Sequence, residues 1–140
     1  KTLPNHMFNK ILLDAPCSGE DPRFLTAADL GGWSLAKVKR LAILQKKMLK
    51  ESWKLLKPGG MLVYSTCSQA PEENEQVITW FLRTHDNATT KAPAISLPFN
   101  GTTRIKTVVQ FGVTSQASAL RIPAQPHYIA FFVCCLVKLP

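Results

Sequence analysis

A long amphipathic segment lies between two short apolar runs, and this order constrains the fold more than any other feature of the sequence. The runs are Lys10–Asp14 and Met61–Thr66, each with the length and composition of a buried strand. Between them, Ser34 is a suitable N-cap for a helix that extends to about Lys57. A strand, a helix and a second strand in this order form a parallel pair joined by a crossover. We therefore expect an α/β fold with a sheet that is parallel at least in its first part.

The expected helix has an apolar face and a basic face. Its apolar positions recur at helical spacing and define a core face of Val38, Leu41, Ala42, Met48, Leu49 and Leu56. The residues "KPGG" (57–60) are expected to end it. Eight basic residues lie on this helix against one acid, Glu51, which is typical of a solvated face. The alternative is a stripe that contacts phosphates, with Lys39, Arg40, Lys46, Lys47 and Lys50 as its candidates.

The second half of the chain predicts one more helix and further strands. Pro71-Glu72-Glu73 is expected to open a helix whose buried face comprises Val77, Ile78, Phe81 and Leu82. Residues 86–103 are rich in Thr, Pro, Asn and Ala and predict an exposed connection. The runs "RIKTVVQF" (104–111) and "ALRI" (119–122) are candidate strands, and "YIAFFVCCLVK" (128–138) predicts a terminal strand.

Length and charge limit the function classes. The chain has 140 residues, the size of one domain, and lacks an apolar run of the roughly 20 residues that a membrane span needs. With 17 Lys and Arg against 9 Asp and Glu, its net charge is +8, which favours a polyanionic partner such as nucleic acid. A merely basic soluble protein explains the charge equally well.

The four cysteines do not form a disulfide or zinc pattern. Cys134 and Cys135 are adjacent in an apolar run and are expected to be small core residues. Cys17 and Cys67 stand alone, no Cys-x-x-Cys occurs, and the three histidines are scattered, so we expect no metal site. We expect a reducing, intracellular compartment.

Polar and nucleophilic residues follow both strands of the expected parallel pair. Asp14 and Cys17 come at the end of the first strand, and Cys67 at the end of the second. In open α/β sheets, the ligand crevice lies outside the carboxyl ends of the strands. A single cysteine at a strand end is usually structural, but two thiols and a carboxylate that converge on one crevice indicate a reactive site.

The residues around these cysteines resemble a known family. "DAPCSG" (14–19) and "KPGGMLVYSTCSQAPEENE" (57–75) are similar to the motifs of the Sun-type (Fmu/Nop) RNA cytosine-5 methyltransferases. The resemblance is dense over Ile11–Gly19 and Lys57–Glu75, fair in the helix between them, and weak from about Asp86 to Ala119. It returns faintly in "ALRIP" and "AFFVCCLVK".

The resemblance implies a fold, a reaction and a set of site residues. The fold is a Rossmann-like class I methyltransferase domain that uses S-adenosylmethionine, with a mostly parallel sheet and an antiparallel terminal strand. By similarity, Cys67 is the nucleophile that adds to carbon 6 of cytosine in rRNA or tRNA, and Cys17 assists product release. Asp14 matches a carboxylate that contacts the base and the cofactor. Turn and support positions are Pro16, Ser18, Gly19, Thr66 and Ser68.

The cofactor-binding part of that domain is not found in this sequence. No Gly-x-Gly-x-x-Gly occurs, so residues 1–140 correspond to the C-terminal half of the catalytic domain. We expect the N-terminal half of the same domain to be the missing partner, the first strand to have an open edge, and the isolated chain to be inactive. The expected location is cytoplasmic, or nucleolar in a eukaryote.

Two other function classes remain open from the sequence. A non-catalytic basic module that binds RNA or a protein partner would show salt-sensitive RNA binding without cofactor binding. A thiol redox protein that uses Cys17 and Cys67 would form an intramolecular disulfide under mild oxidation.

Overall fold

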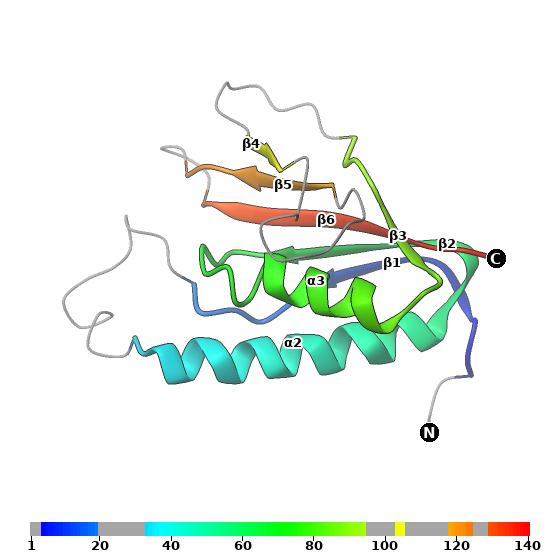
Figure 1. Cartoon of the computed structure of the whole chain (residues 1–140), viewed down its shortest axis with the longest axis horizontal. Helices are drawn as coiled ribbons and strands as arrows, with labels where there is room; N and C mark the ends of the chain where they lie inside the picture. The colour runs from blue at the N-terminus through cyan, green and yellow to red at the C-terminus, as the bar shows by residue number, and fades with distance from the viewer. Residues whose placement is uncertain (1–3, 20–32, 95–102, 106–117, 125–128) are drawn as a thin grey trace.

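The computed structural model describes residues 4–19, 33–94, 103–105, 118–124 and 129–140. Within these residues, two helices cover one six-stranded sheet (Figure 1). The strand order is β1-β2-β6-β5-β4, and β3 pairs with β6 beside this path. The elements in chain order are β1 (Phe8–Asp14), α2 (Leu35–Leu55), β2 (Leu56–Thr66), α3 (Glu75–Thr84), β3 (Ala88–Lys91), β4 (Thr103–Ile105), β5 (Ala119–Ile122) and β6 (Phe131–Lys138).

The predicted α/β crossover is confirmed. Strands β1 and β2 are parallel, with Leu13 opposite Tyr64 and Asp14 opposite Ser65, and α2 connects them. The terminal strand β6 runs antiparallel to β2, as expected. The pairings of β3 and β5 with β6, and of β4 with β5, are also antiparallel. Among the described strands, the antiparallel share is therefore larger than the sequence predicts.

Helix α2 begins where the sequence predicts. Ser34 is its N-cap, and the Ser34 Oγ accepts a hydrogen bond from the Lys37 backbone N–H at 3.1 Å. The buried residues are Val38, Ala42, Gln45, Leu49 and Trp53. Leu41 and Met48 are only half-buried, so the core face is rotated slightly from the prediction and includes a glutamine and a tryptophan.

The expectation that "KPGG" ends the helix is wrong in detail. The helix already ends at Leu55, and residues 57–60 form a bulge within β2, between Leu56 opposite Phe8 and Met61 opposite Lys10. Gly59 has φ +75°, which favours glycine, and a Cβ on Gly60 would lie 2.9 Å from the carbonyl oxygen of Asn9. Gly59 thus permits the turn of the backbone in the bulge, and Gly60 permits the close approach of β1 and β2.

The start of the second helix also differs from the prediction. Residues 71–74 form a turn, and α3 begins at Glu75, the acid in its first helical turn. Within the turn, the backbone N–H of Asn74 donates to the Pro71 carbonyl oxygen at 3.2 Å. This turn buries Glu73 and Asn74, which a continuous helix from Pro71 would place differently.

The later strands confirm most of the weaker expectations. β5 coincides with the predicted run at 119–122, whereas β6 begins at Phe131 and covers only the later part of the predicted run at 128–138. Ile129 and Ala130 precede the strand, and Tyr128 lies outside the described residues. Of the run 104–111, residues 104 and 105 belong to β4, and the remainder lies outside the described residues. The connection predicted at 86–103 instead contains β3, which pairs antiparallel with the end of β6, where Ala88 lies opposite Lys138.

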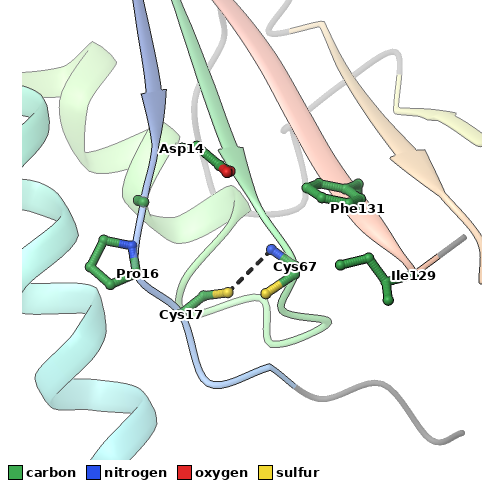
Figure 2. Close-up of a pocket in the computed structure, with 7 residues that line it drawn as sticks. Asp14, Pro16, Cys17, Cys67, Ile129 and Phe131 are labelled. Atoms are coloured by element: carbon green, nitrogen blue, oxygen red, sulfur yellow. Dashed lines mark hydrogen bonds between the residues drawn. The ribbon is translucent and has the colours of Figure 1, made fainter. Parts of the chain in front are cut away.

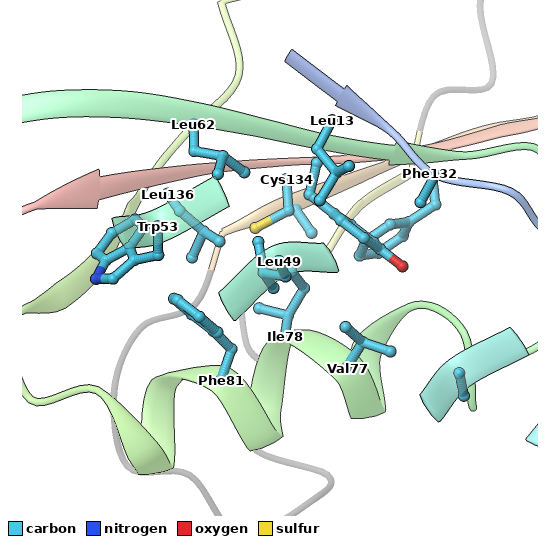
Figure 3. Packing of buried hydrophobic residues seen from close by; sticks show 14 of the residues in the cluster. Leu13, Leu49, Trp53, Leu62, Val77, Ile78, Phe81, Phe132, Cys134 and Leu136 are labelled. Carbon is cyan, nitrogen blue, oxygen red and sulfur yellow. The ribbon is translucent and has the colours of Figure 1, made fainter. Parts of the chain in front are cut away.

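One core joins both helices to the same face of the sheet (Figure 3). Leu49 and Trp53 from α2 meet Val77, Ile78 and Phe81 from α3 over the strand residues Leu13, Leu62, Tyr64, Phe132, Cys134 and Leu136. The Trp53 and Phe81 rings pack edge to face, with centroids 5.0 Å apart. Cys134 and Cys135 are buried free thiols, as predicted.

Strand β1 forms one edge of the sheet. No strand of the described residues pairs with its outer side, and Leu12 on this strand is 72% exposed. Met7 and Phe8 near its start are also exposed apolar residues. The two helices that the structure describes are not long and apolar enough to cross a membrane.

Candidate active site

The carboxyl ends of β1 and β2 meet at a pocket of about 440 Å³. Because the strands are parallel neighbours, the segments that follow them leave the sheet side by side. Figure 2 shows Asp14, Cys17 and Cys67 around this pocket, with Phe131 and Ile129 on its opposite side. Ala15 and Pro16 complete the described lining. The predicted convergence of the two cysteine segments with Asp14 is therefore present in the geometry.

The two cysteines are in direct contact. The Cys67 backbone N–H donates a hydrogen bond to the Cys17 Sγ at 3.2 Å (Figure 2). Both thiols are free and half-buried. Burial, followed by the interaction with the Cys67 side chain, raises the pKa of the Cys17 thiol to about 12. Cys17 is therefore protonated at neutral pH, which disfavours it as a nucleophile.

Asp14 is the last residue of β1 and is exposed at the pocket. Its Oδ1 accepts a hydrogen bond from the Ser65 hydroxyl at 2.7 Å. Ser65 is the residue opposite Asp14 in the β1–β2 pairing, so the sheet register itself fixes one oxygen of this carboxylate. A carboxylate fixed in this way can accept further hydrogen bonds from a bound molecule.

Residues 15–19, the Cys17 loop, are held by backbone and side-chain contacts. The Ala15 backbone N–H donates to the Ser65 carbonyl oxygen at 2.9 Å, which extends the pairing by one residue. The Ser18 and Ser68 hydroxyls lie 3.0 Å apart and link the two cysteine segments. Gly19 turns the loop with φ +70°, a conformation that side chains disfavour.

The segment after Cys67 is held by a buried hydrogen-bond network. Thr66 Oγ1 donates to Asn74 Oδ1 at 2.5 Å, and Asn74 Nδ2 donates to the Ser68 carbonyl oxygen at 2.8 Å. The Ala70 backbone N–H donates to the Ser68 hydroxyl at 3.0 Å. Thr66, Ser68 and Asn74 are fully buried. Cys67 is therefore flanked by residues with fixed positions.

Arg121 holds the same segment from β5. Its Nε and an Nη contact the two carboxylate oxygens of Glu75, each at 2.7 Å, in a bidentate pair. The other Nη donates to the carbonyl oxygen of Gln69 at 3.2 Å. This contact connects the turn after Cys67 to α3 and to the sheet.

A buried pair of polar side chains lies behind the Cys17 loop. Glu73 Oε2 accepts hydrogen bonds from the Ser18 backbone N–H at 3.1 Å and from Gln45 Nε2 at 2.8 Å. Gln45 Nε2 also donates to the Pro16 carbonyl oxygen at 2.9 Å. Glu73 and Gln45 are both fully buried. They therefore connect α2, the Cys17 loop and the turn before α3.

Sequence reasoning did not single out several of these residues. Gln45 is a polar residue in the middle of the helical apolar spacing, and that mismatch was a signal available in the sequence. Glu73 was assigned to a helix start that the structure moves to Glu75. Ile129 and Phe131 reach the pocket only because β6 pairs with β2, which no local pattern shows.

The basic candidates on α2 lie apart from the pocket lining. Lys39, Arg40, Lys47 and Lys50 are exposed, so their charges are available to a partner. Lys46 is half-buried, and its Nζ lies 5.5 Å from the centroid of the Trp80 ring, so this side chain also packs against α3. No group of three His, Cys, Asp or Glu side chains in the described residues could hold a metal ion.

Two curated relatives match part of the chain. A mouse protein named tRNA (cytosine(72)-C(5))-methyltransferase NSUN6 is 48% identical over 77 residues, which are 55% of this chain and 16% of the relative. The ribosomal RNA small subunit methyltransferase F of Enterobacter sp. (strain 638) is 41% identical over 90 residues, 64% of this chain and 19% of the relative. The chain thus spans less than a fifth of either relative.

Solved structures share the fold. A methyltransferase homolog protein from Pyrococcus horikoshii matches 95% of this chain with a TM-score of 0.64 and 33% identity, and the chain covers 40% of it. The structure of NSun6 from Pyrococcus horikoshii with SFG matches 92% of the chain with a TM-score of 0.63 and 26% identity, and the chain covers 29% of it. Both similarities confirm a partial Rossmann-like methyltransferase fold.

The family assignment rests on nearly the whole chain. The sequence profile described as 16S rRNA methyltransferase RsmB/F matches residues 1–137. The matched range includes both cysteine segments and β6 except its last residue, Lys138, and it agrees with the resemblance that the motifs indicate. The chain belongs to the 16S rRNA methyltransferase RsmB/F family.

Proposed function

We propose that this chain carries the reactive half of a site that methylates carbon 5 of cytosine in rRNA or tRNA. The observation that carries the proposal is the meeting of two thiols and a carboxylate in one pocket at the ends of β1 and β2. The relatives named for cytosine-5 or ribosomal RNA methylation support the reaction and the class of substrate. The site of action would be the cytoplasm, or the nucleolus in a eukaryote.

Cys67 is the nucleophile in this proposal. Carbon 5 of cytosine is a weak nucleophile, and addition of the Cys67 thiolate to carbon 6 moves the electron pair of the 5,6 double bond toward carbon 5. The base must leave its stack to reach the thiolate, and the pocket is lined by Phe131 and Ile129, which offer apolar surface to a flat ring.

Cys17 serves product release. The carbon 5 proton must leave, the 5,6 double bond must form again, and the bond between carbon 6 and the Cys67 sulfur must break. Cys17, a thiol at neutral pH next to Cys67, can protonate the departing sulfur and then take up the carbon 5 proton. Cys17 thus gives one proton to the Cys67 sulfur and takes up one from carbon 5, and it ends the reaction as a thiol.

Asp14 contacts the base and the cofactor. The methyl donor S-adenosylmethionine, when bound, supplies an electrophilic methyl group. The described residues fit one flank of such a cationic, partly flat molecule, because the pocket offers one exposed carboxylate and the Phe131 ring. Asp14 Oδ1 is already engaged by Ser65, so Oδ2 remains to accept a hydrogen bond from the cytosine ring edge.

The rest of the cofactor site comes from a second segment that completes the sheet. The outer edge of β1 is open within the described residues, and Leu12 there is 72% exposed. An open apolar edge favours pairing with a further strand. We infer that this segment is the N-terminal half of the same catalytic domain and that the isolated chain is inactive.

A covalent adduct tests the reaction. The chain is grafted in place of the matching segment of the Pyrococcus horikoshii methyltransferase homolog, which supplies a complementary half. With cytosine RNA and S-adenosylmethionine, the Cys17→Ala graft should retain RNA in a denaturant-stable complex, because release fails after Cys67 has added. The Cys67→Ala graft should retain none.

RNA that contains 5-fluorocytosine distinguishes the proposed enzyme from a basic binding module without catalytic activity. RNA with 5-fluorocytosine lacks a carbon 5 proton, so the unsubstituted graft should also remain attached to it. If neither RNA gives an adduct with any graft, while salt-sensitive RNA binding persists, the chain is a binding module instead. Titration of S-adenosylmethionine into the 140-residue chain should show no tight binding.

A further inference from the structure

Glu73 is a buried carboxylate that no step of the proposed reaction uses. It is fully buried, and its Oε1 has no hydrogen-bond partner among the described residues. The Oε1 of Gln45, its neighbour, is also buried without a partner in the described part of the chain. Buried polar atoms without partners reduce stability, and an apolar pair of similar volume is often as stable or more so. The contribution of this pair to stability therefore does not explain its presence.

The contacts of Glu73 connect the two segments that carry the cysteines. Its side chain accepts the Ser18 backbone N–H at 3.1 Å, one residue after Cys17. Its own backbone lies in the turn that follows Cys67, where the Glu73 carbonyl oxygen accepts the Tyr64 hydroxyl at 2.7 Å. Burial, followed by the Glu73 charge, raises the pKa of Tyr64, so this hydroxyl stays protonated and donates.

Gln45 fixes the same loop from the helix. Its Nε2 donates both to the Pro16 carbonyl oxygen at 2.9 Å and to Glu73 Oε2 at 2.8 Å. Cys17 therefore lies between two backbone groups, on Pro16 and Ser18, that are each held by this buried pair. In this position, the Cys17 Sγ accepts a hydrogen bond from the Cys67 backbone N–H at 3.2 Å.

We propose that Glu73 is a positioning residue that, together with Gln45, holds the Cys17 thiol against Cys67. The inference rests on the proposed function for the roles of the two cysteines in catalysis, but the positioning itself requires neither RNA nor methyl donor. Loss of the Glu73 acceptor releases the Ser18 N–H, and the Cys17 loop then exchanges its buried contacts for water.

Site-resolved alkylation of the 140-residue chain tests the positioning. Iodoacetamide at pH 8 is followed by fragment-ion mass spectrometry of the three peptides that carry Cys17, Cys67, and the adjacent Cys134 and Cys135. Glu73→Leu should raise the Cys17 rate about tenfold, because the acceptor of the Ser18 backbone N–H has been lost. Cys134 and Cys135 are buried in the core and report general opening, so their rates should not change.

Three further variants make the result specific. Glu73→Gln keeps an acceptor oxygen of the same reach and should stay within about twofold of the unsubstituted rate. Gln45→Met removes the contact to Pro16 at similar length and should also raise the Cys17 rate. Glu72→Leu, the control, changes the neighbouring carboxylate, which forms no hydrogen bond to residues 15–19, and should have no effect.

Two outcomes overturn the proposal. One is an unchanged Cys17 rate in folded Glu73→Leu, or in Gln45→Met if Glu73→Leu does not fold. The other is a parallel rise at Cys17, Cys134 and Cys135, which shows that the pair only supports the core. In the grafted enzyme, Glu73→Leu should accumulate the RNA adduct and Glu73→Gln should release it. Adduct formation that fails in every graft would contradict the proposed function alone and leave the alkylation result standing.

Discussion

The two ends of the β1–β2 pair are built in opposite ways. At the far end from the pocket, carbonyl groups where α2 ends have donors: the backbone N–H groups of His6 and Met7 donate to the carbonyl oxygens of Lys54 and Leu55. Lys138 Nζ bonds to the carbonyl oxygens of Trp53 and Leu56 at 2.8 and 2.9 Å. At the pocket end, the oxygens of Glu73 and Gln45 include buried atoms without described partners.

The far end therefore contributes mainly to stability, and the pocket end mainly to reactivity. These donors contribute to folding, since the last carbonyl groups of a helix have no donor within the helix itself. Buried polar atoms without partners are costs that a fold tolerates where a site needs them. Substitutions at the pocket end should therefore change chemistry with little effect on stability, and substitutions at the far end should do the reverse.

The largest effect should come from Asp14→Asn at the pocket end. In the grafted enzyme, methyl transfer should fall about 10²–10⁴-fold, the usual range for a lost acid–base contribution. The midpoint of urea unfolding should hardly move, because Asp14 is exposed. Asp86→Asn, an exposed carboxylate elsewhere, is the control for the same change of charge. Equal activity of the two variants would contradict the role of Asp14.

The next effect should come from Lys138→Met at the far end. The free energy of unfolding should fall by about 1.5–3 kcal/mol, because a buried charged donor to two carbonyl groups is lost. Urea denaturation of the 140-residue chain measures it. Lys54→Met removes an exposed lysine that forms a surface ion pair with Glu51 at 2.7 Å and should cost far less. A changed Cys17 alkylation rate in Lys138→Met would contradict the conclusion that substitutions at the far end leave the reactivity of the pocket end unchanged.

The sequence predicts the pocket end better than the far end, and the physical reason is locality. The strand ends carry Asp14, Cys17 and Cys67 in short contiguous motifs, and the βαβ order alone brings them together. The far end joins His6, Trp53 and Lys138, whose contacts depend on how the first and last described segments meet α2. The contacts of Glu73 likewise do not follow from the sequence, because they depend on the turn at residues 71–74.

A smaller effect should appear in the pH dependence of Cys17. Its folded pKa of about 12 lies above the ordinary value of 9.0, mainly through burial and then through Cys67. The stabilisation that accompanies the protonated thiol is complete below about pH 9 and is lost as the pH rises toward 12. Cys67→Ala removes the second cause and leaves the first, so the midpoint of Cys17 alkylation should move down but stay above 9.0. No movement would show that burial alone raises this pKa.

The smallest effect should distinguish the two ends of α2 in RNA binding. Helix α2 begins on the side of the molecule where β1 and β2 end, and it ends on the opposite side (Figure 1). Arg40 lies in the first third of this helix and Lys50 in its last third. If RNA reaches the pocket along α2, Arg40→Gln should reduce the slope of log affinity against log salt by about 0.7, the value for one phosphate contact of a single strand. Lys50→Gln, an exposed charge at the other end, should reduce it less. Equal reductions would indicate that the whole basic face contacts RNA, and no reduction in either variant would identify that face as merely solvated.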